Sequence, residues 1–412
     1  MASHFEQLPN ELIVSIGILL PIRSIGTYCS IASKFHRIGR TENFWRQKFL
    51  LDAPAQAWQD YYDSVSSSLL VHGMASGCAL GQGDFIFNSV PTIMPKIKPK
   101  FIATSDSKSA LIDMDNNLWV CGSNFNIDLG ITGGELIKTW TKVPNLQVKY
   151  VAPNMGLMLI DMQNRVFHAG LDARLQEFRD YGYQMYERSS SSHHFQPFTT
   201  KAGSQVYASK IVNSHYITIL LQERQLLMYC DSFVMRRFEP NFRYINSNGG
   251  KRVNELVFDI VAKDVAFNDE FILAIDSHDH VVMYSCNNKP GPDTVMYGSK
   301  CWKYALDRRG NKIVAKKVVA GNKGILILGL DNRVWISGLN IKYPGKLRAL
   351  DIEARGDYIA IIDLDHNLWC NYDYKKGQHW PTDPKTVLSQ IPNVKIRKIA
   401  IDARHSLMIS TF

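Results

Sequence analysis

Apolar runs and short polar turns alternate along most of the chain. Four stretches share an order of turn-forming residues followed by an apolar-aromatic run: residues 113–122, 161–170, 329–338 and 363–372. Each of them follows another apolar run. Two such runs joined by an Asx-rich turn predict a β-hairpin. Repetition of one hairpin at a period of roughly 50 residues predicts a β-propeller or a related array.

Each end of the repeat region carries half of a unit. Residues 397–412 have the first half and then the chain stops, whereas residues 68–83 have the second-strand pattern with no first strand before it. A ring closed by strands from both ends accounts for both halves and removes an open sheet edge. The predicted fold class is therefore mainly β: a seven-bladed β-propeller over residues 69–412.

The first 50 residues have a helical period instead. Apolar positions of the first segment recur at helical spacing: Leu12, Ile13, Ile16, Leu19 and Leu20. Pro9 suits the first turn of a helix, and Pro21 ends it. Two more short helices are expected over residues 23–38 and from residue 41 onward. The pattern predicts a small all-α three-helix module over residues 5–51, followed by a linker over residues 52–68.

This helical segment resembles an F-box. The resemblance rests on Leu-Pro pairs at residues 8–9 and 20–21 and on Phe-Trp at residues 44–45. An F-box docks on the Skp-type adaptor of cullin-based ubiquitin ligases. The resemblance implies a set of adaptor-binding residues: Leu8, Pro9, Leu12, Ile13, Leu20, Pro21, Ile25, Cys29, Phe35 and Trp45.

The repeat region resembles the regulator of chromosome condensation (RCC) family of β-propellers. In that family an apolar strand leads to a small residue and His-Ser, and a second strand ends in an aromatic residue near glycine. Residues 403–408 match the first part, residues 119–124 and 335–340 match the second, and residues 77–83 resemble the glycine-rich end. The resemblance is specific for fold and weak for function, although the best-known member promotes nucleotide exchange on a small GTPase.

The charge lies in the repeat region. The formal net charge is +9, and residues 1–66 hold six Lys/Arg and six Asp/Glu, so the excess falls in residues 67–412. A basic domain favours an acidic partner or nucleic acid. Candidate contacts to such a partner are the paired basic residues: Arg236, Arg237, Lys251, Arg252, Arg308, Arg309, Lys316 and Lys317. Insertions at residues 172–207 and 287–312 would add binding loops.

The sequence contains no motif that indicates catalysis, a metal or a cofactor. It has no nucleotide-binding glycine loop, no nucleophile elbow and no H-E-x-x-H. His193 and His194 have no third ligand at metal spacing. The recurring aspartates, Asp113 and Asp363 among them, fall in the same turn of each repeat and are predicted to be turn formers. His405 is predicted to be a hydrogen-bonded structural residue. We therefore expect a protein that is not an enzyme and has no metal or cofactor.

Cysteine usage predicts a reducing compartment. The seven cysteines are odd in number and lack C-x-x-C spacing, which argues against disulfides and zinc. We expect the cytoplasm or nucleus, or a virion if the source is viral, with no signal peptide and no membrane partner.

Three functions remain open at this stage. The leading hypothesis is an F-box-type substrate receptor that links a Skp-cullin ubiquitin ligase to an unknown protein target on the propeller. The alternative is a structural or nucleic-acid-packaging protein with a basic, self-assembling propeller. A lower alternative is guanine-nucleotide exchange on a small GTPase.

Overall fold

The computed structural model describes residues 9–19 and most of residues 68–410. In the second range it leaves out residues 75, 84–86, 95–96, 106, 154–155, 170–194, 199–203, 214–216, 223–224, 231–253, 268–270, 286–291, 298–299, 322–323, 338–346, 357, 372–387 and 403–404. The chain divides into two compact units, Met1–Ser68 with Ser410–Phe412, and Leu69–Ile409.

The described part of the first unit is helix α2 (Asn10–Leu19). The carbonyl of Pro9 accepts a hydrogen bond from the Ile13 N–H at 3.1 Å, so the first predicted helix forms directly after Pro9. The second and third predicted helices and residues 52–67 of the predicted linker lie outside the described residues. No described helix is long and apolar enough to cross a membrane.

The second unit consists of antiparallel sheets, as the alternating pattern predicts. One sheet has seven strands in the order β2-β1-β26-β25-β24-β23-β22. Its strands are β1 (Leu69–Met74), β2 (Phe87–Met94), β22 (Ala349–Arg355), β23 (Tyr358–Asp363), β24 (Asn367–Cys370), β25 (Ser389–Ile401) and β26 (His405–Ser410). A second seven-stranded sheet follows chain order from β3 to β9. Its strands are β3 (Pro99–Ser105), β4 (Lys108–Asp113), β5 (Asn117–Ser123), β6 (Leu136–Pro153), β7 (Leu157–Asp161), β8 (Val166–Ala169) and β9 (Gln196–Pro197).

Three smaller sheets complete the described part of this unit. The four-stranded sheet contains β10 (Lys210–Asn213), β11 (Ile217–Leu221), β12 (Leu226–Cys230) and β13 (Asn254–Phe258). The five-stranded sheet contains β14 (Ala262–Phe267), β15 (Ile272–Asp276), β16 (Val281–Tyr284), β18 (Lys300–Tyr304) and β17 (Thr294–Tyr297). The three-stranded sheet contains β19 (Ala315–Ala320), β20 (Ile325–Gly329) and β21 (Val334–Ser337). Two 3₁₀ turns, η1 (Ser76–Cys78) and η2 (Phe125–Ile127), follow β1 and β5.

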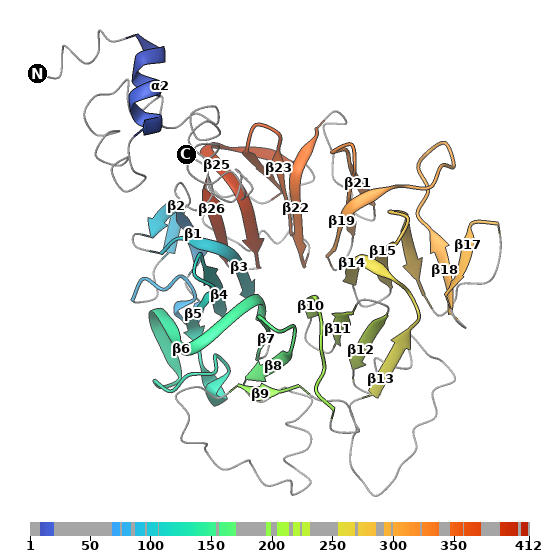
Figure 1. The fold of residues 1–412 in the computed structure, drawn as a ribbon, viewed down its shortest axis with the longest axis horizontal. Helices are drawn as coiled ribbons and strands as arrows, with labels where there is room; N and C mark the ends of the chain where they lie inside the picture. Colours follow the sequence, from blue (N-terminus) through green and yellow to red (C-terminus); the bar gives the residue numbers. More distant parts are fainter. Residues whose placement is uncertain are drawn as a thin grey trace, which may run out of the picture. The chain divides into compact units, whose positions relative to one another are not determined.

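The first strands of successive groups lie side by side. Each strand in the series β3, β6, β10, β14, β19, β22 and β25 contacts the next one, and β25 contacts β3. Figure 1 shows these groups following one another in chain order around a common centre. The long strand β6 pairs with β5 up to Gln147 and with β7 from Val148, so it links two groups of strands within its sheet.

Strands from opposite ends of the unit pair with each other. β1 and β26 are antiparallel, in register from Leu69 opposite Ile409 to Gly73 opposite His405. Leu69 and Ile409 are both fully buried. The partly complete patterns at the two ends of the repeat region therefore meet in one sheet.

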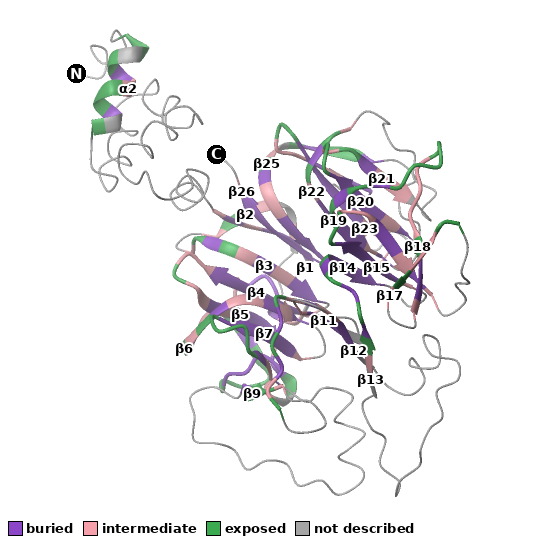
Figure 2. Ribbon diagram, turned by 45° about the vertical axis from the view of Figure 1, so that its right-hand side comes forward, coloured by how far each residue is buried: buried purple, intermediate pink, exposed green. Residues whose placement is uncertain are grey.

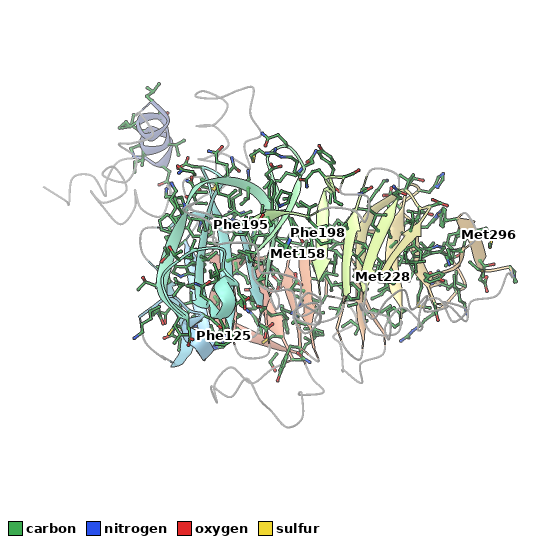
Figure 3. The ribbon with its side chains drawn as sticks, turned by 90° about the horizontal axis from the view of Figure 1, so that it is seen from below. Phe125, Met158, Phe195, Phe198, Met228 and Met296 are labelled. Carbon is green, nitrogen blue, oxygen red and sulfur yellow. The ribbon has the colours of Figure 1, made fainter. Side chains whose placement is uncertain are left out.

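The core lies between neighbouring sheets. Figure 2 shows buried residues along the strands and exposed residues in the turns. Met158 packs in one cluster with Phe198, both labelled in Figure 3. The insertion at residues 287–312 is partly a hairpin, because β17 and β18 extend the sheet beyond β16. Trp302 of β18 is fully buried, with its ring 5.7 Å from that of Phe258.

Candidate interaction face

The repeated turns are held by their aspartates. Asp363 Oδ1 accepts the backbone N–H groups of Asp365 (2.9 Å) and Asn367 (2.8 Å), and its Oδ2 accepts Trp369 Nε1–H at 2.8 Å. Asp113 makes the same bonds, including one from Trp119 Nε1–H at 2.8 Å. The prediction that these aspartates form turns is confirmed, and in these two turns the tryptophan of the following strand donates to the aspartate.

The fourth residue of each turn connects neighbouring strand groups. These residues have positive φ: Asn116, Asn164, Asp279, Asn332 and His366. Asn and Asp tolerate this conformation better than most residues. The carbonyl of each accepts a hydrogen bond of 2.8–2.9 Å from a backbone N–H of the next group of strands: Val148 in β6, Ala208 before β10, Ala315 in β19, Ala349 in β22 and Ile396 in β25. These bonds place every turn beside the start of the next inner strand, on one face of the propeller.

A β-bulge follows at the start of five inner strands. The pairing register shifts at Lys100, Lys149, Lys263, Lys316 and Leu350. Ser209, directly before β10, and Arg397, in β25, follow Ala208 and Ile396 and hold the equivalent positions. A bulge turns the extra residue away from the ladder. This bulge position therefore carries four lysines and one arginine, and no acidic residue.

We define the turn face by three sets of positions. They are the bulge positions, the positions two residues before each bulge position, and the second residue of each repeated turn. The turn face gathers exposed apolar side chains: Met162, Tyr207, Val261, Val314, Leu330, Leu350 and Leu364. Exposed apolar residues mixed with cations are typical of a protein-binding surface. The turn face is the candidate functional site.

Several bulge lysines bond to the turn of their own repeat. Lys100 Nζ lies 3.1 Å from Asn116 Oδ1, and Lys316 Nζ lies 2.6 Å from Asn332 Oδ1. Lys263 Nζ pairs with Asp279 Oδ1 at 2.6 Å. In each case 16 residues separate lysine and turn residue. Bonds to neutral asparagine leave the charge of Lys100 and Lys316 available to a partner.

The residue after each bulge position points toward the centre of the inner strands. We call this set the axial ring: Phe101, Tyr150, Lys210, Asp264, Lys317, Asp351 and Lys398. Its members touch across sheets. Lys210 pairs with Asp264, and Lys317 Nζ lies 2.7 Å from Asp351 Oδ1 and 3.4 Å from Glu353 Oε2. The rings of Phe101 and Tyr150 are 4.8 Å apart.

Burial and charge set the protonation of the axial ring. Burial favours the neutral amine of Lys317, but Asp351 and Glu353 outweigh it and raise its pKa above the usual range. Burial raises the pKa of Tyr150, so the phenol stays neutral. The axial ring therefore ties neighbouring strand groups together with charged pairs.

The predicted basic contacts lie in different parts of the structure. Lys316 lies on the turn face, and Arg308 and Arg309 are exposed in the turn after β18. Lys317 is only partly exposed, and its ammonium is paired with Asp351 and Glu353. The remaining four lie outside the described residues: Arg236, Arg237, Lys251 and Arg252.

The predicted adaptor contacts are only partly described. Pro9 and Leu12 are exposed, whereas Ile13 is fully buried in its own unit and has no surface to offer. The others lie outside the described residues: Leu8, Leu20, Pro21, Ile25, Cys29, Phe35 and Trp45.

Two lysines at the bulge positions, Lys149 and Lys263, are absent from the predicted contacts. Neither has a basic neighbour in the sequence, so a search for basic pairs and clusters passes over them. The signal that would have found three of the bulge lysines is the constant separation of 16 residues from the turn Asx.

The predicted structural histidine, His405, lies in the core. His405 Nε2 lies 2.9 Å from Ser109 Oγ, and both residues are fully buried, as a structural role requires. No group of three or more His, Cys, Asp or Glu among the described residues could hold a metal ion.

Solved structures share this fold. A crystal structure of yeast RCC1 (Prp20) bound to Kap60 aligns with a TM-score of 0.62 and 15% identity, over 86% of this chain and 92% of that chain. Prp20p from Saccharomyces cerevisiae, described with its binding properties to Gsp1p and histones, aligns with a TM-score of 0.61 and 15% identity, over 87% of this chain and 95% of that chain. Human WBSCR16 aligns with a TM-score of 0.60 and 13% identity, over 84% of this chain and 99% of that chain. No family model and no curated protein sequence matches the chain. The second unit is thus an RCC1-like β-propeller.

This finding corrects the leading functional hypothesis. The F-box-type receptor for a Skp-cullin ligase is contradicted, because the similar structures are RCC1-like propellers, which agree better with the exchange alternative. The short Leu-Pro and Phe-Trp matches misled the sequence reasoning, since a few residues in a small helical segment specify a function weakly.

Proposed function

We propose that this chain is a non-catalytic binding propeller that engages a small GTPase through its turn face and promotes exchange of the bound guanine nucleotide. The propeller would have seven blades, closed by the pairing of β1 with β26. Exchange by such a protein needs only binding energy that favours the nucleotide-free state of the partner.

The observation that carries the proposal is the composition of the turn face. Exposed aliphatic residues such as Leu330 and Leu364 lie among lysines on successive strand groups. Desolvated apolar contacts supply affinity, and the surrounding charges orient the partner. The fold adds support, since Prp20p, which shares it, is described as binding Gsp1p.

The experiment measures release of a fluorescent GDP from purified Gsp1p and from a panel of other small GTPases. The chain should accelerate release from at least one of them. Leu330→Asp should reduce the acceleration by about tenfold, because it places a charge in an apolar contact.

Met296 supplies the matched control. It is 50% exposed, compared with 52% for Leu330, but it lies in β17 at the periphery of the unit (Figure 3). Met296→Asp should leave release unchanged. Equal loss in both variants, or no acceleration with any GTPase, contradicts the proposal.

A second candidate is nucleic-acid packaging, favoured by the lysines that repeat at the bulge positions. Phosphate contacts of this kind would make binding fall steeply with salt. The measurement is the affinity for duplex DNA as a function of salt concentration. A flat salt dependence, or DNA binding that survives replacement of Lys100 and Lys316 by glutamine, removes this candidate.

A further inference from the structure

Ion pairs at the centre of the turn face involve two of the three axial lysines. In the axial ring, Lys210 is matched by Asp264, and Lys317 is matched by Asp351 together with Glu353. Asp264 is committed further, because its Oδ2 accepts the Val318 N–H at 3.0 Å. The third axial lysine, Lys398, forms no ion pair with any described residue.

Lys398 is held in place by an aromatic ring instead. Its Nζ lies 5.7 Å from the centre of the Phe101 ring, and Phe101 packs on Tyr150. Lys398 is half-buried. A cation over a ring face keeps its N–H donors free for a second partner. The Phe101 side chain therefore orients the Lys398 ammonium without neutralising its charge.

The surroundings increase the positive potential at this point. The bulge positions around the axial ring hold Lys100, Lys149, Lys263, Lys316 and Arg397 and no acidic residue. Lys263 is matched by Asp279, whereas Lys100 and Lys316 bond to neutral asparagines. An anionic group approaching the centre of the turn face meets several cations at once.

The neighbouring apolar residues indicate which kind of anion fits. Val261 and Val314 are exposed immediately before two inner strands, and Leu350 occupies a bulge position. A nucleic-acid backbone gains little from aliphatic side chains, because its phosphates need charged and polar donors. A protein segment that carries both carboxylates and apolar side chains can use both kinds of contact.

We infer that the centre of the turn face binds an acidic segment of a partner protein, with a carboxylate placed on Lys398 and apolar side chains of the segment on Val261, Val314 and Leu350. The inference rests on the proposed function in one respect, since it takes the turn face as the binding face. Burial lowers the pKa of Lys398, against the effect of Asp351 and Glu353, so a carboxylate from the partner would gain strength in a partly desolvated site.

The experiment uses the full chain and a short fluorescein-labelled peptide rich in glutamate and leucine. Fluorescence anisotropy gives its affinity. Two probes run beside it: the same peptide with glutamine in place of glutamate, and a single-stranded oligodeoxythymidylate of equal charge. The glutamate peptide should bind, and the glutamine peptide should bind about tenfold more weakly or not at all.

Lys398→Met keeps the aliphatic stem over Phe101 and removes the charge. It should weaken the glutamate peptide by about tenfold. Lys303→Met, at an exposed lysine of β18 that lies outside the turn face, removes the same charge from the chain and should have no effect. Thermal unfolding of both variants establishes that they are folded. Should Lys398→Met fail to fold, Lys316→Gln together with Lys100→Gln tests the same surface.

Absence of peptide binding, equal loss in Lys398→Met and Lys303→Met, or tighter binding of the oligonucleotide than of the peptide overturns the inference. Peptide binding that depends on Lys398 without any effect on GDP release supports this inference and removes the exchange function. Acceleration of GDP release by the unmodified chain, together with no binding of the glutamate peptide to it, supports the exchange function and overturns this inference.

Discussion

Single side chains decide how each repeat is held. The turn aspartates accept several hydrogen bonds each from backbone N–H groups, and Asp113 and Asp363 also accept one from a tryptophan of the following strand. Their sequence pattern marked them as turn formers, and the geometry agrees. The number of donors around one carboxylate has a measurable consequence for stability and its dependence on pH.

Asp363→Asn should lower the free energy of unfolding at pH 7 by about 2 kcal/mol, because an amide nitrogen cannot accept the bonds made to Oδ2. Burial opposes ionisation of Asp363, but the bonds from Trp369 and Asn367 outweigh it and hold the pKa below its ordinary value of 3.8. The contribution is therefore present above pH 3.8 and is lost as pH falls through the lower folded pKa.

Denaturant unfolding followed by tryptophan fluorescence measures this effect between pH 7 and the acid range. Asp365→Asn is the control, because Asp365 is exposed and contributes only its backbone N–H to the turn. An equal loss in the two variants would show that the Asp363 carboxylate has no special role.

Lys317→Met should destabilise the fold by about 3 kcal/mol, because it leaves Asp351 and Glu353 close together without a cation. The raised pKa of Lys317 means that its contribution is complete below the ordinary value of 10.5 and declines as pH rises above it. Lys316→Met, one residue away and exposed, should cost about 0.5 kcal/mol or less. Chemical denaturation of both variants makes the comparison, and similar losses would refute the axial role of Lys317.

At the scale of the element, the hairpin turn and the bulge after it act together. The carbonyl of the positive-φ turn residue accepts a hydrogen bond from the next group of strands, as Asp279 does from Ala315. The residue directly after that donor, here Lys316, is the bulge residue and lies on the surface. One turn thus fixes the position of the neighbouring sheet and the direction of a turn-face side chain.

Asn332 tests the conformational part of this device. Its φ is 66°, and its carbonyl accepts the Ala349 N–H at 2.8 Å. Asn332→Gly should change the free energy of unfolding by about 0.5 kcal/mol or less, whereas Asn332→Val should lower it by about 2 kcal/mol, since a β-branched residue is strained at positive φ. Both variants lose the contact with Lys316, so the difference between them isolates the backbone. Equal stability would contradict the strain argument.

At the scale of the molecule, one pairing joins the two ends of the second unit. β26 lies between β25 and β1, and it contributes the fully buried Leu407, Met408 and Ile409. The pairing makes the fold depend on residues that are far apart in sequence, as is usual for β proteins of high contact order.

Deletion of residues 405–412 should abolish cooperative thermal unfolding and yield insoluble protein, because it uncovers the edges of β1 and β25. Deletion of residues 1–66 should leave a single cooperative transition, since those residues belong to the other unit. Calorimetry and soluble yield measure both outcomes. A soluble, cooperative chain without residues 405–412 would show that the ends do not hold the unit together.

The sequence by itself determined the repeating hairpin, its turn aspartates and the mainly β fold. These follow from local physics: alternation of apolar residues, Asx turns and aromatic strands leave a direct trace in the order of residues. The repeated stretches at residues 113–122 and 363–372 each contain the turn and second strand of a hairpin for this reason. The predicted ligase function was wrong, because it rested on a few residues of a short helical segment.

Only the tertiary structure decided which residues share a face. Lys316 and Lys317 are neighbours in the sequence, yet a bulge sends Lys316 to the surface and Lys317 to the carboxylates of another sheet. Lys398 and Phe101 meet because β25 returns beside β3. Such contacts depend on bulges and on how successive sheets are placed around a centre. No local pattern of residues records those placements, so the turn face and its unmatched lysine became visible only in the folded chain.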